Sequence, residues 1–296
     1  MLNAAATAAI GALAGADPAT FVRLAIAMLA LQCSIGALND LVDEPLDARE
    51  KPGKPIPAGE ATRRAAAVVA VAGGVLGVAL SAASGLPTAV AALGCLGLGY
   101  VYDVRLSRTA LSWLPLSLAL PLLPIHAWLG ATGSIPPGLV TLGPVAILAG
   151  AGLSLANGLV DLERDARGGR RAVTVALGRG RTWLLQTVAL GGAVVLALWL
   201  APTGLPTDPA PAAAGFLIDP GILRAVRTFG VPIGSAVIGA GAFVLRSQRP
   251  ALRERGWELE AIGVAGVGLG WLCGTALSAA GAAALAAIGG GAAAQA

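Results

Sequence analysis

The chain has 296 residues, of which 56% are hydrophobic and only 12% are charged. Because soluble domains carry about a quarter of charged residues, this composition excludes an ordinary soluble protein and indicates a polytopic membrane protein. The formal net charge is +4, and the basic residues are divided among several short loops. We therefore expect the lipid bilayer, and no nucleic acid, as the macromolecular surroundings.

Apolar runs of about 20 residues, the length of a helix that crosses the hydrocarbon layer, predict the spans. We expect about eight transmembrane helices, at 18–38, 63–83, 86–102, 111–130, 138–159, 183–201, 225–245 and 261–287. The first 15 residues are apolar as well, but they are too short to span the bilayer. The expected fold is all-α, a polytopic membrane helical bundle with one domain over residues 1–296.

Loop charge predicts the orientation in the membrane. All of the 20 basic residues except Arg23, Arg224 and Arg227 fall in the loops after the first, third, fifth and seventh predicted span. Short loops that are rich in Lys and Arg stay in the cytoplasm, so these four loops are predicted to be cytoplasmic. We expect an integral protein of the bacterial plasma membrane.

Two acidic segments stand out at the ends of the first and fifth predicted spans. The first reads NDLVDEPLDAR at 39–49 and the second NGLVDLERDAR at 157–167, and they agree at seven of eleven positions. Carboxylates are costly at a membrane face unless they serve a function. The repeat predicts two parallel halves of four helices, roughly 18–130 and 138–287, with their acidic faces opposite each other across a central cavity.

The spacing within the first segment places its carboxylates together. On a helix, Asp40, Asp43 and Asp47 share one face, and Asn39 lies a turn before Asp43. Pro45 cannot donate to the carbonyl group four residues earlier, so the sequence predicts that the helix kinks or ends just before it, near residue 44.

The second segment has the same property, because Asn157, Asp161 and Asp165 recur every four residues. Carboxylates that converge at one membrane face repel one another, and a hard divalent cation with oxygen ligands relieves the repulsion. Mg²⁺ typically takes one or two carboxylates together with substrate phosphates, so we expect a diphosphate held through metal. The predicted metal ligands are Asp40, Asp43, Asp47, Asp161 and Asp165.

Three motifs in order resemble those of the UbiA-type intramembrane prenyltransferases. The signature N-D-x-x-D-x-x-x-D is present at 39–47, and the Arg-Pro-Leu/Ile-Pro-x-Gly element that follows it in the family is similar to 54–59. The second signature, D-x-x-x-D, is present at 161–165 and precedes a Thr-to-Gly element at 174–178. Tyr102 and Arg105 resemble the family's Tyr and basic residue, although lysine is commoner at the latter position and arginine at that of Lys54. The family usually has one more complete helix before the first motif.

The resemblance implies Mg²⁺-dependent transfer of a prenyl group from a prenyl diphosphate to a small-molecule acceptor. The aspartates would hold Mg²⁺ on the diphosphate, basic residues would bind phosphate oxygens, and a tyrosine would support the leaving group. The implied catalytic residues are Asp40, Asp43, Asp161, Asp165, Tyr102 and Arg105. The implied substrate-binding residues are Asn39, Asp47, Lys54, Asn157 and Arg171.

A phenolic acid of quinone synthesis is the expected acceptor, because such acceptors are frequent in the family. Glycerol phosphate, phosphoribose and tetrapyrrole acceptors stay open. A membrane transporter could also use acidic clusters as a cation site in repeated halves, but it would favour charges near the midplane. A CDP-alcohol phosphotransferase would need D-G-x-x-A-R before G-x-x-x-D-x-x-x-D, and residues 161–171 do not supply that order.

Overall fold

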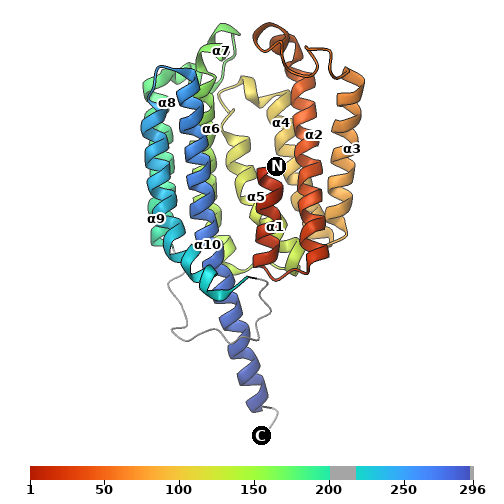
Figure 1. The fold of residues 1–296 in the computed structure, drawn as a ribbon, viewed down its shortest axis with the longest axis vertical. Helices are drawn as coiled ribbons and strands as arrows, with labels where there is room; N and C mark the ends of the chain where they lie inside the picture. The colour runs from red at the N-terminus through yellow and green to blue at the C-terminus, as the bar shows by residue number, and fades with distance from the viewer. Residues whose placement is uncertain (201–217, 294–296) are drawn as a thin grey trace.

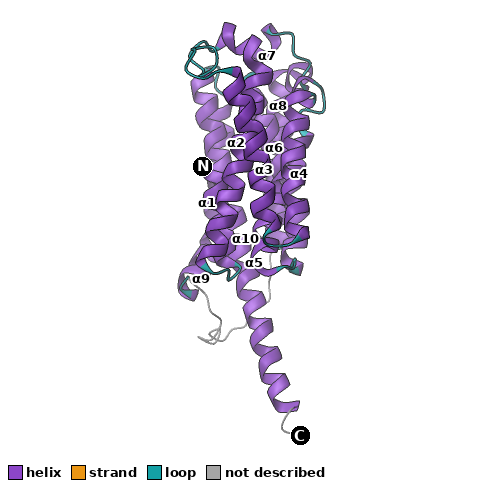
Figure 2. Ribbon diagram, turned by 90° about the vertical axis from the view of Figure 1, so that its right-hand side faces the viewer, coloured by secondary structure: helices purple, strands orange, loops and turns teal. Residues whose placement is uncertain are grey.

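The structure is a computed structural model that describes residues 1–200 and 218–293. Within these ranges it contains only helices and no strand (Figure 2), so the predicted all-α fold is confirmed. The elements are α1 (Leu2–Leu13), α2 (Pro18–Glu50), α3 (Arg63–Ala82), α4 (Leu86–Val104), the 3₁₀ helix η1 (Leu106–Arg108), α5 (Leu114–Thr132), α6 (Pro137–Val160), α7 (Leu162–Arg167), α8 (Val173–Trp199), α9 (Pro220–Leu245) and α10 (Pro250–Ala293).

Eight of the described helices, α2 to α6 and α8 to α10, are long and apolar enough to cross a membrane. The prediction of a bundle with eight spans is therefore confirmed. Helix α1 has 12 residues, which corresponds to about 18 Å at the rise of an α-helix, well short of the hydrocarbon thickness of about 30 Å. Its N-terminus lies partway up the bundle (Figure 1).

Several helices continue beyond the apolar runs that predict them. Helix α2 extends to Glu50 instead of 38, α8 begins at Val173 instead of 183, and α10 begins at Pro250 instead of 261. Hydropathy marks only the part of a helix that lies in hydrocarbon, whereas a helix can continue into the polar region with charged residues. Residue 201 of the sixth predicted span lies outside the described residues.

Of the kink or end expected near Glu44, an end is wrong, because the helix runs through Pro45 to Glu50, and a kink stays a prediction. A proline inside a helix removes one backbone hydrogen bond and crowds the preceding turn. The turns that follow are held by other contacts, since Asp47 accepts a hydrogen bond from Lys54 and its carbonyl group accepts one from the backbone N–H of Lys51. The first acidic segment therefore lies entirely on a helix.

Helices α9 and α10 form a close pair that relies on glycine. A Cβ atom added at Gly234 would lie 2.6 Å from the carbonyl oxygen of Gly263, and one added at Gly263 would lie 2.6 Å from that of Gly234. At Gly241 the added atom would meet the carbonyl oxygen of Gly256 at 2.7 Å. Small residues let helix backbones approach closely in lipid, where packing drives helix association.

The two acidic segments meet at one end of the bundle. Helix α2 carries the first segment near its C-terminus, and the second segment begins on the last turn of α6, which ends at Val160, and continues through the short α7. In Figure 1, α7 and the end of α2 both lie at the top, on opposite sides of the bundle's midline. The topology therefore brings together residues that are far apart in the sequence.

Candidate functional site

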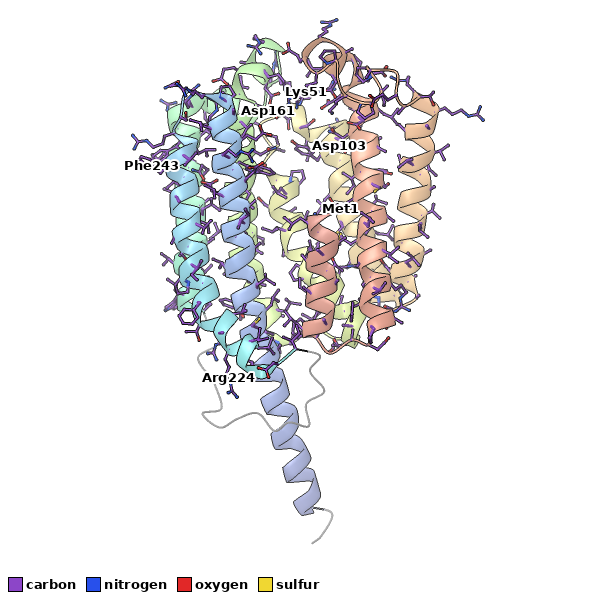
Figure 3. All side chains as sticks on the ribbon, in the orientation of Figure 1. Met1, Lys51, Asp103, Asp161, Arg224 and Phe243 are labelled. Carbon is purple, nitrogen blue, oxygen red and sulfur yellow. The ribbon has the colours of Figure 1, made fainter. Side chains whose placement is uncertain are left out.

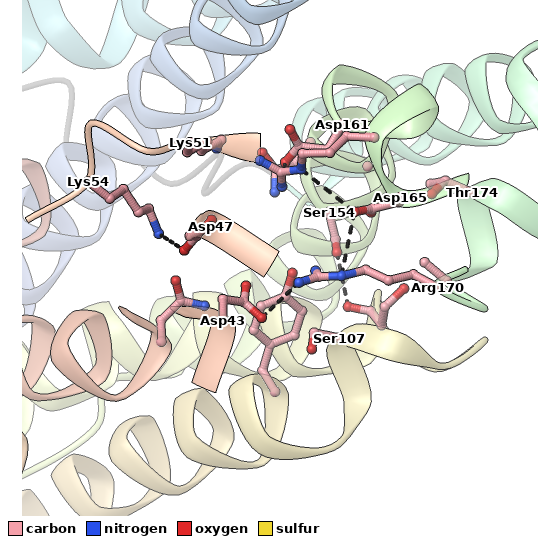
Figure 4. Close-up of a pocket in the computed structure, with 17 residues that line it drawn as sticks. Asp43, Asp47, Lys51, Lys54, Ser107, Ser154, Asp161, Asp165, Arg170 and Thr174 are labelled. Atoms are coloured by element: carbon pink, nitrogen blue, oxygen red, sulfur yellow. Dashed lines mark hydrogen bonds and ion pairs between the residues drawn. The ribbon is translucent and has the colours of Figure 1, made fainter. Parts of the chain in front are cut away.

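A cavity of about 250 Å³ lies between the two acidic segments. Figure 3 shows Lys51 and Asp161 at the same end of the bundle, far from Arg224 at the other end. Of the site residues expected from the sequence, the cavity is lined by Asn39, Asp43, Asp47, Lys54, Tyr102, Asn157, Asp161 and Asp165 (Figure 4). These side chains come from α2, the loop after it, α4, α6 and α7, so several helices build one site.

The first half of the cavity is organised by a lysine. The Nζ atom of Lys54 lies 2.7 Å from Oδ2 of Asp47 and 2.9 Å from Oδ1 of Asp40. Burial alone would lower the pKa of Lys54, but the hydrogen bonds to Asp47 and Asp40 outweigh it and raise the pKa above its usual value. Lys54 is therefore charged at neutral pH, and it holds Asp47 in a buried position.

The second half is built where α6 gives way to α7. Asp161 is the residue between the two helices, and its Oδ2 atom lies 2.8 Å from Nη2 of Arg164. Asp165 is buried on α7, and its Oδ1 atom lacks a hydrogen-bond partner among the described residues. Burial raises the pKa of Asp165, Arg170 opposes the rise, and the negative charge of Asp161 adds to it.

One arginine reaches from the second half to the first. Nη2 of Arg170 lies 2.7 Å from Oδ1 of Asp43, and its Nε atom lies 3.7 Å from Oδ1 of Asp165. Figure 4 shows the Arg170 side chain extended between these two carboxylates. The Arg170 side chain is only 9% exposed, and its guanidinium joins the two acidic segments directly.

The local fold explains why Arg170 points this way. Helix α7 ends in a Schellman motif, in which the N–H of Arg170 donates to the carbonyl of Asp165 at 2.9 Å and that of Gly169 donates to Ala166 at 3.2 Å. Gly169 has a φ of 67°, in the left-handed region that favours glycine. The chain reverses there, and the next side chain returns toward the helix that it has just left.

Two predicted phosphate-binding residues lie outside this cavity. Arg105 is exposed at the end of α4 and does not line it, and Arg171 lines a second cavity next to it. Asp40 is not a lining residue either, and it contacts the cavity through Lys54. Among the neighbouring basic residues, Arg108 instead of Arg105 reaches Asp43, at 3.4 Å, and Arg170 instead of Arg171 occupies the centre.

Sequence reasoning missed several lining residues. These are Lys51, Ser107, Ser112, Ser154, Gly158, Arg164, Arg170, Ala172 and Thr174. A signal existed for one of them, since two glycines directly after a short helical segment indicate a C-terminal cap and a chain reversal. The serines lie in a loop and on a span without a spacing that would have distinguished them from packing residues.

The donor set fits a hard divalent cation in its chemistry. The described residues hold no cluster of three or more acidic, His or Cys side chains that could bind a metal alone. Mg²⁺ needs only one or two carboxylates when substrate phosphates and water complete its shell. Asp43 and Asp47 on one side and Asp161 and Asp165 on the other supply this, and Oδ1 of Asp165 accepts no hydrogen bond within the described residues, since Nε of Arg170 lies 3.7 Å away.

Comparisons with known proteins show the family of this chain. A profile of the UbiA prenyltransferase family matches residues 1–232. Digeranylgeranylglyceryl phosphate synthase from Pyrococcus abyssi is 25% identical over 197 residues, which cover 66% of this chain and 69% of that protein. The protein of the same name from Methanopyrus kandleri is 32% identical over 193 residues, which cover 64% of this chain and 67% of the relative.

A solved structure shares the fold over nearly the whole chain. It is that of a UbiA homologue from Archaeoglobus fulgidus bound to GPP and Mg²⁺, with a TM-score of 0.63 and 16% identity, covering 90% of this chain and 96% of the other. The fold and the family match define an integral membrane enzyme that transfers prenyl groups. The chain belongs to the UbiA prenyltransferase family, which decides against the transporter and the phosphotransferase.

Proposed function

We propose that this protein transfers a prenyl group from a prenyl diphosphate to a glycerol phosphate acceptor, with Mg²⁺ as cofactor. The observation that carries the proposal is the charge balance of the cavity. Four acidic side chains, Asp43, Asp47, Asp161 and Asp165, face four basic ones, Lys51, Lys54, Arg164 and Arg170. A diphosphate would add several uncompensated negative charges, and a divalent cation held by the aspartates supplies the missing positive charge.

The residues of the cavity would act by binding and orienting the diphosphate. Lys54, Arg164 and Arg170 present N–H donors toward its oxygens, and charge-assisted hydrogen bonds of this kind are strong. The bond between the prenyl carbon and the diphosphate oxygen breaks, the diphosphate leaves with the electron pair, and an acceptor hydroxyl bonds to the carbon and releases its proton. Tyr102 lines the cavity where it can contact the leaving group. Bound Mg²⁺ neutralises charge on the departing diphosphate.

The acceptor class rests on the two relatives that are named digeranylgeranylglyceryl phosphate synthases. They favour a glycerol phosphate carrying a hydrocarbon chain over the phenolic acid of quinone synthesis that the resemblance led us to expect. The cavity offers Ser107, Ser154 and Thr174 as partners for hydroxyl groups. A polyol phosphate has hydroxyls to match them, and among the described residues no aromatic side chain except Tyr102 lines the cavity to stack on a phenol.

The experiment uses the purified protein in nanodiscs with labelled geranylgeranyl diphosphate. An alkylglyceryl phosphate and 4-hydroxybenzoate are offered separately, with Mg²⁺ or with EDTA. We expect Mg²⁺-dependent transfer to the glyceryl phosphate only. Transfer to the hydroxybenzoate alone would remove the proposed acceptor and restore the phenolic one.

The shared metal site has its own variants. Asp43→Asn and Asp161→Asn should each abolish transfer, because each removes an acidic ligand from one side of the cavity. Glu60→Gln, at an exposed position in the loop after α2, is the matched control and should keep wild-type activity. Near-normal turnover of both aspartate variants at saturating Mg²⁺ would refute the shared site.

A further inference from the structure

A second cavity, of about 450 Å³, lies directly beside the first. One wall is the outer face of α2, with Val42, Pro45 and Leu46, and the opposite wall is Arg108 together with the loop 168–171. Arg170 lines both cavities. The two hollows are therefore neighbours that share one guanidinium.

The lining of the second cavity has a net positive charge, whereas the acidic and basic side chains that line the first are equal in number. Within the part of the chain that the structure describes, three arginines line it and no acidic residue does. Arg171 is exposed and has no ion pair or hydrogen bond within the described part of the chain. Arg108 has only long contacts, each of 3.4 Å, to Asp43 and to the carbonyl of Val42. Only Arg170 is closely paired, so an anion is the ligand that matches this wall.

The side chains of the two walls indicate which class of anion the cavity binds. Three guanidinium groups suit a phosphate monoester, because arginine donates paired N–H groups to phosphate oxygens. The facing wall of Val42, Pro45 and Leu46 is apolar, which suits a hydrocarbon attached close to the phosphate. A ligand with both features is an amphiphile that carries a terminal phosphate.

We propose that this cavity binds the phosphate of the acceptor, with Arg108 and Arg171 as its specificity-determining residues. The proposal rests on the proposed function, since it assumes a phosphate-bearing acceptor. Arg170 separates this phosphate from the diphosphate in the first cavity, and its charge lets two anionic groups lie on either side of it. The acceptor hydroxyl then points past Arg170 toward the prenyl carbon.

Binding is measured first, without turnover. An alkylglyceryl phosphate and the same alkylglycerol without phosphate are titrated into the protein in phosphatidylcholine nanodiscs, with tryptophan fluorescence as the readout. The wild type should bind the phosphate probe at least about tenfold more tightly than the alcohol, as expected for hydrogen bonds to a charged group. Arg171→Gln and Arg108→Gln should each reduce this ratio by several-fold. Arg249→Gln, at an exposed position after α9, is the matched control and should leave the ratio unchanged.

Kinetics then separate the two cavities. In Arg171→Gln the KM for the alkylglyceryl phosphate should rise about tenfold while the KM for geranylgeranyl diphosphate stays within twofold of wild type. A rise in both constants, or an unchanged binding ratio in both arginine variants, overturns the proposal. Arg171→Lys keeps the charge and controls for folding, and it should recover part of the affinity.

Two further outcomes distinguish the sources of phosphate and the two proposals. If phosphatidic acid in the nanodisc displaces the probe, the cavity takes a lipid head group and the assignment to the acceptor is overturned. If the probe binds through Arg171 but only 4-hydroxybenzoate is prenylated, the proposed function fails and the phosphate site remains. If the wild type binds both probes equally, the phosphate site fails and the proposed function is untouched.

Discussion

A single guanidinium joins the two acidic segments of this enzyme. Arg170 contacts Asp43 on α2 and approaches Asp165 on α7. Asp43 and Arg170 are 127 positions apart in the chain, and they come together because α2 and α6 end at the same face of the bundle (Figure 1). Removing the guanidinium would leave two largely buried carboxylates without their shared cation, so its loss should destabilise the fold as well as weaken substrate binding.

The first prediction concerns this residue. Arg170→Gln should raise the KM for the prenyl diphosphate by at least about tenfold, since a charge-assisted hydrogen bond contributes about 1.5–3 kcal/mol. Arg170→Lys should recover only part of the loss, because lysine cannot contact two carboxylates through a planar fork. Steady-state kinetics in nanodiscs measure both. Arg167→Gln, which removes an exposed arginine three residues earlier, is the control, and an equal effect there would contradict the assignment.

At the scale of an element, α7 is the part of the fold that positions the second acidic segment. Its C-terminus is capped by Gly169, and its outer side is tied to the rest of the bundle through Glu163. That carboxylate forms ion pairs with Arg179 of α8 and with Arg253 of α10. Arg253 is fully buried and also donates to the carbonyl groups of Ser247 and Gln248. The C-terminus of this short helix is therefore fixed by its glycine cap, and its N-terminal part is fixed by the ion pairs of Glu163.

The second prediction tests the cap of α7. Gly169→Ala forces a residue with a Cβ atom into a left-handed conformation, at a cost of about 1–2 kcal/mol, and should turn Arg170 away from Asp43. Nothing lies within 4 Å of the added Cβ atom, so the effect comes from the backbone alone. We expect weaker binding of the prenyl diphosphate by calorimetry. Gly168→Ala is the matched control, because Gly168 has a φ of −74° and its added Cβ atom makes only ordinary contacts.

The third prediction concerns the Glu163 attachment and its dependence on pH. Burial raises the pKa of Glu163, but backbone hydrogen bonding and the charges of Arg253 and Arg179 outweigh this and lower it below 4.5. A lowered pKa in the folded state means that the ionised group stabilises the fold above the unfolded value, and that this contribution disappears as the pH falls through the folded pKa. Glu163→Gln should therefore lower the Tm at pH 7 by a few degrees.

The gap in Tm between Glu163→Gln and the wild type should close at a pH below the folded pKa of Glu163. Thermal unfolding in detergent, followed by circular dichroism from pH 7 downward, measures it. Glu258→Gln is the matched control, because Glu258 is as exposed as Glu163 but its partner Arg255 is 73% exposed whereas Arg253 is buried, and exposed pairs contribute little. A constant gap at all pH values would mean that Glu163 acts through its shape and not through its charge.

At the scale of the whole molecule, the sequence predicts the number of membrane-spanning helices and the meeting of the two acidic segments, because both depend on patterns that lipid imposes. Apolar length fixes the spans, and the repeated motif places its carboxylates at equivalent helix ends. The roles expected for Arg105 and Arg171 come from their positions relative to the family's motifs. The direction of each side chain, however, depends on the turns that precede it. The left-handed conformation of Gly169 sets the direction of the Arg170 side chain, and η1 brings Arg108 instead of Arg105 toward Asp43. Such choices follow from tertiary contacts that no periodicity in the chain contains.

Two further expectations at this scale stay predictions, namely the superposition of the halves 18–130 and 138–287 and the cytoplasmic orientation. The fourth prediction addresses the orientation through thiol labelling in a variant without native cysteines. Ala58→Cys, in the loop after α2, should react with a membrane-impermeant reagent only in inverted vesicles. Ser134→Cys, at the opposite end of the bundle between α5 and α6, should react only in intact cells. Labelling of both from one side would refute the predicted topology.

The glycine contact between α9 and α10 indicates which part of the site loses conformational entropy when substrates bind. Backbones that touch at Gly234 and Gly263 have no side-chain rotamers to order, and Arg253, near the start of α10, holds Glu163 of α7. The second acidic segment is thus attached to a rigid pair of helices. We therefore expect that the loop 51–62, which carries Lys54, is the segment that becomes ordered when the prenyl diphosphate binds. Amide hydrogen exchange should accordingly be slow in α9 and α10 at all times. In the loop 51–62 it should be fast in the free enzyme and slow once the prenyl diphosphate is bound.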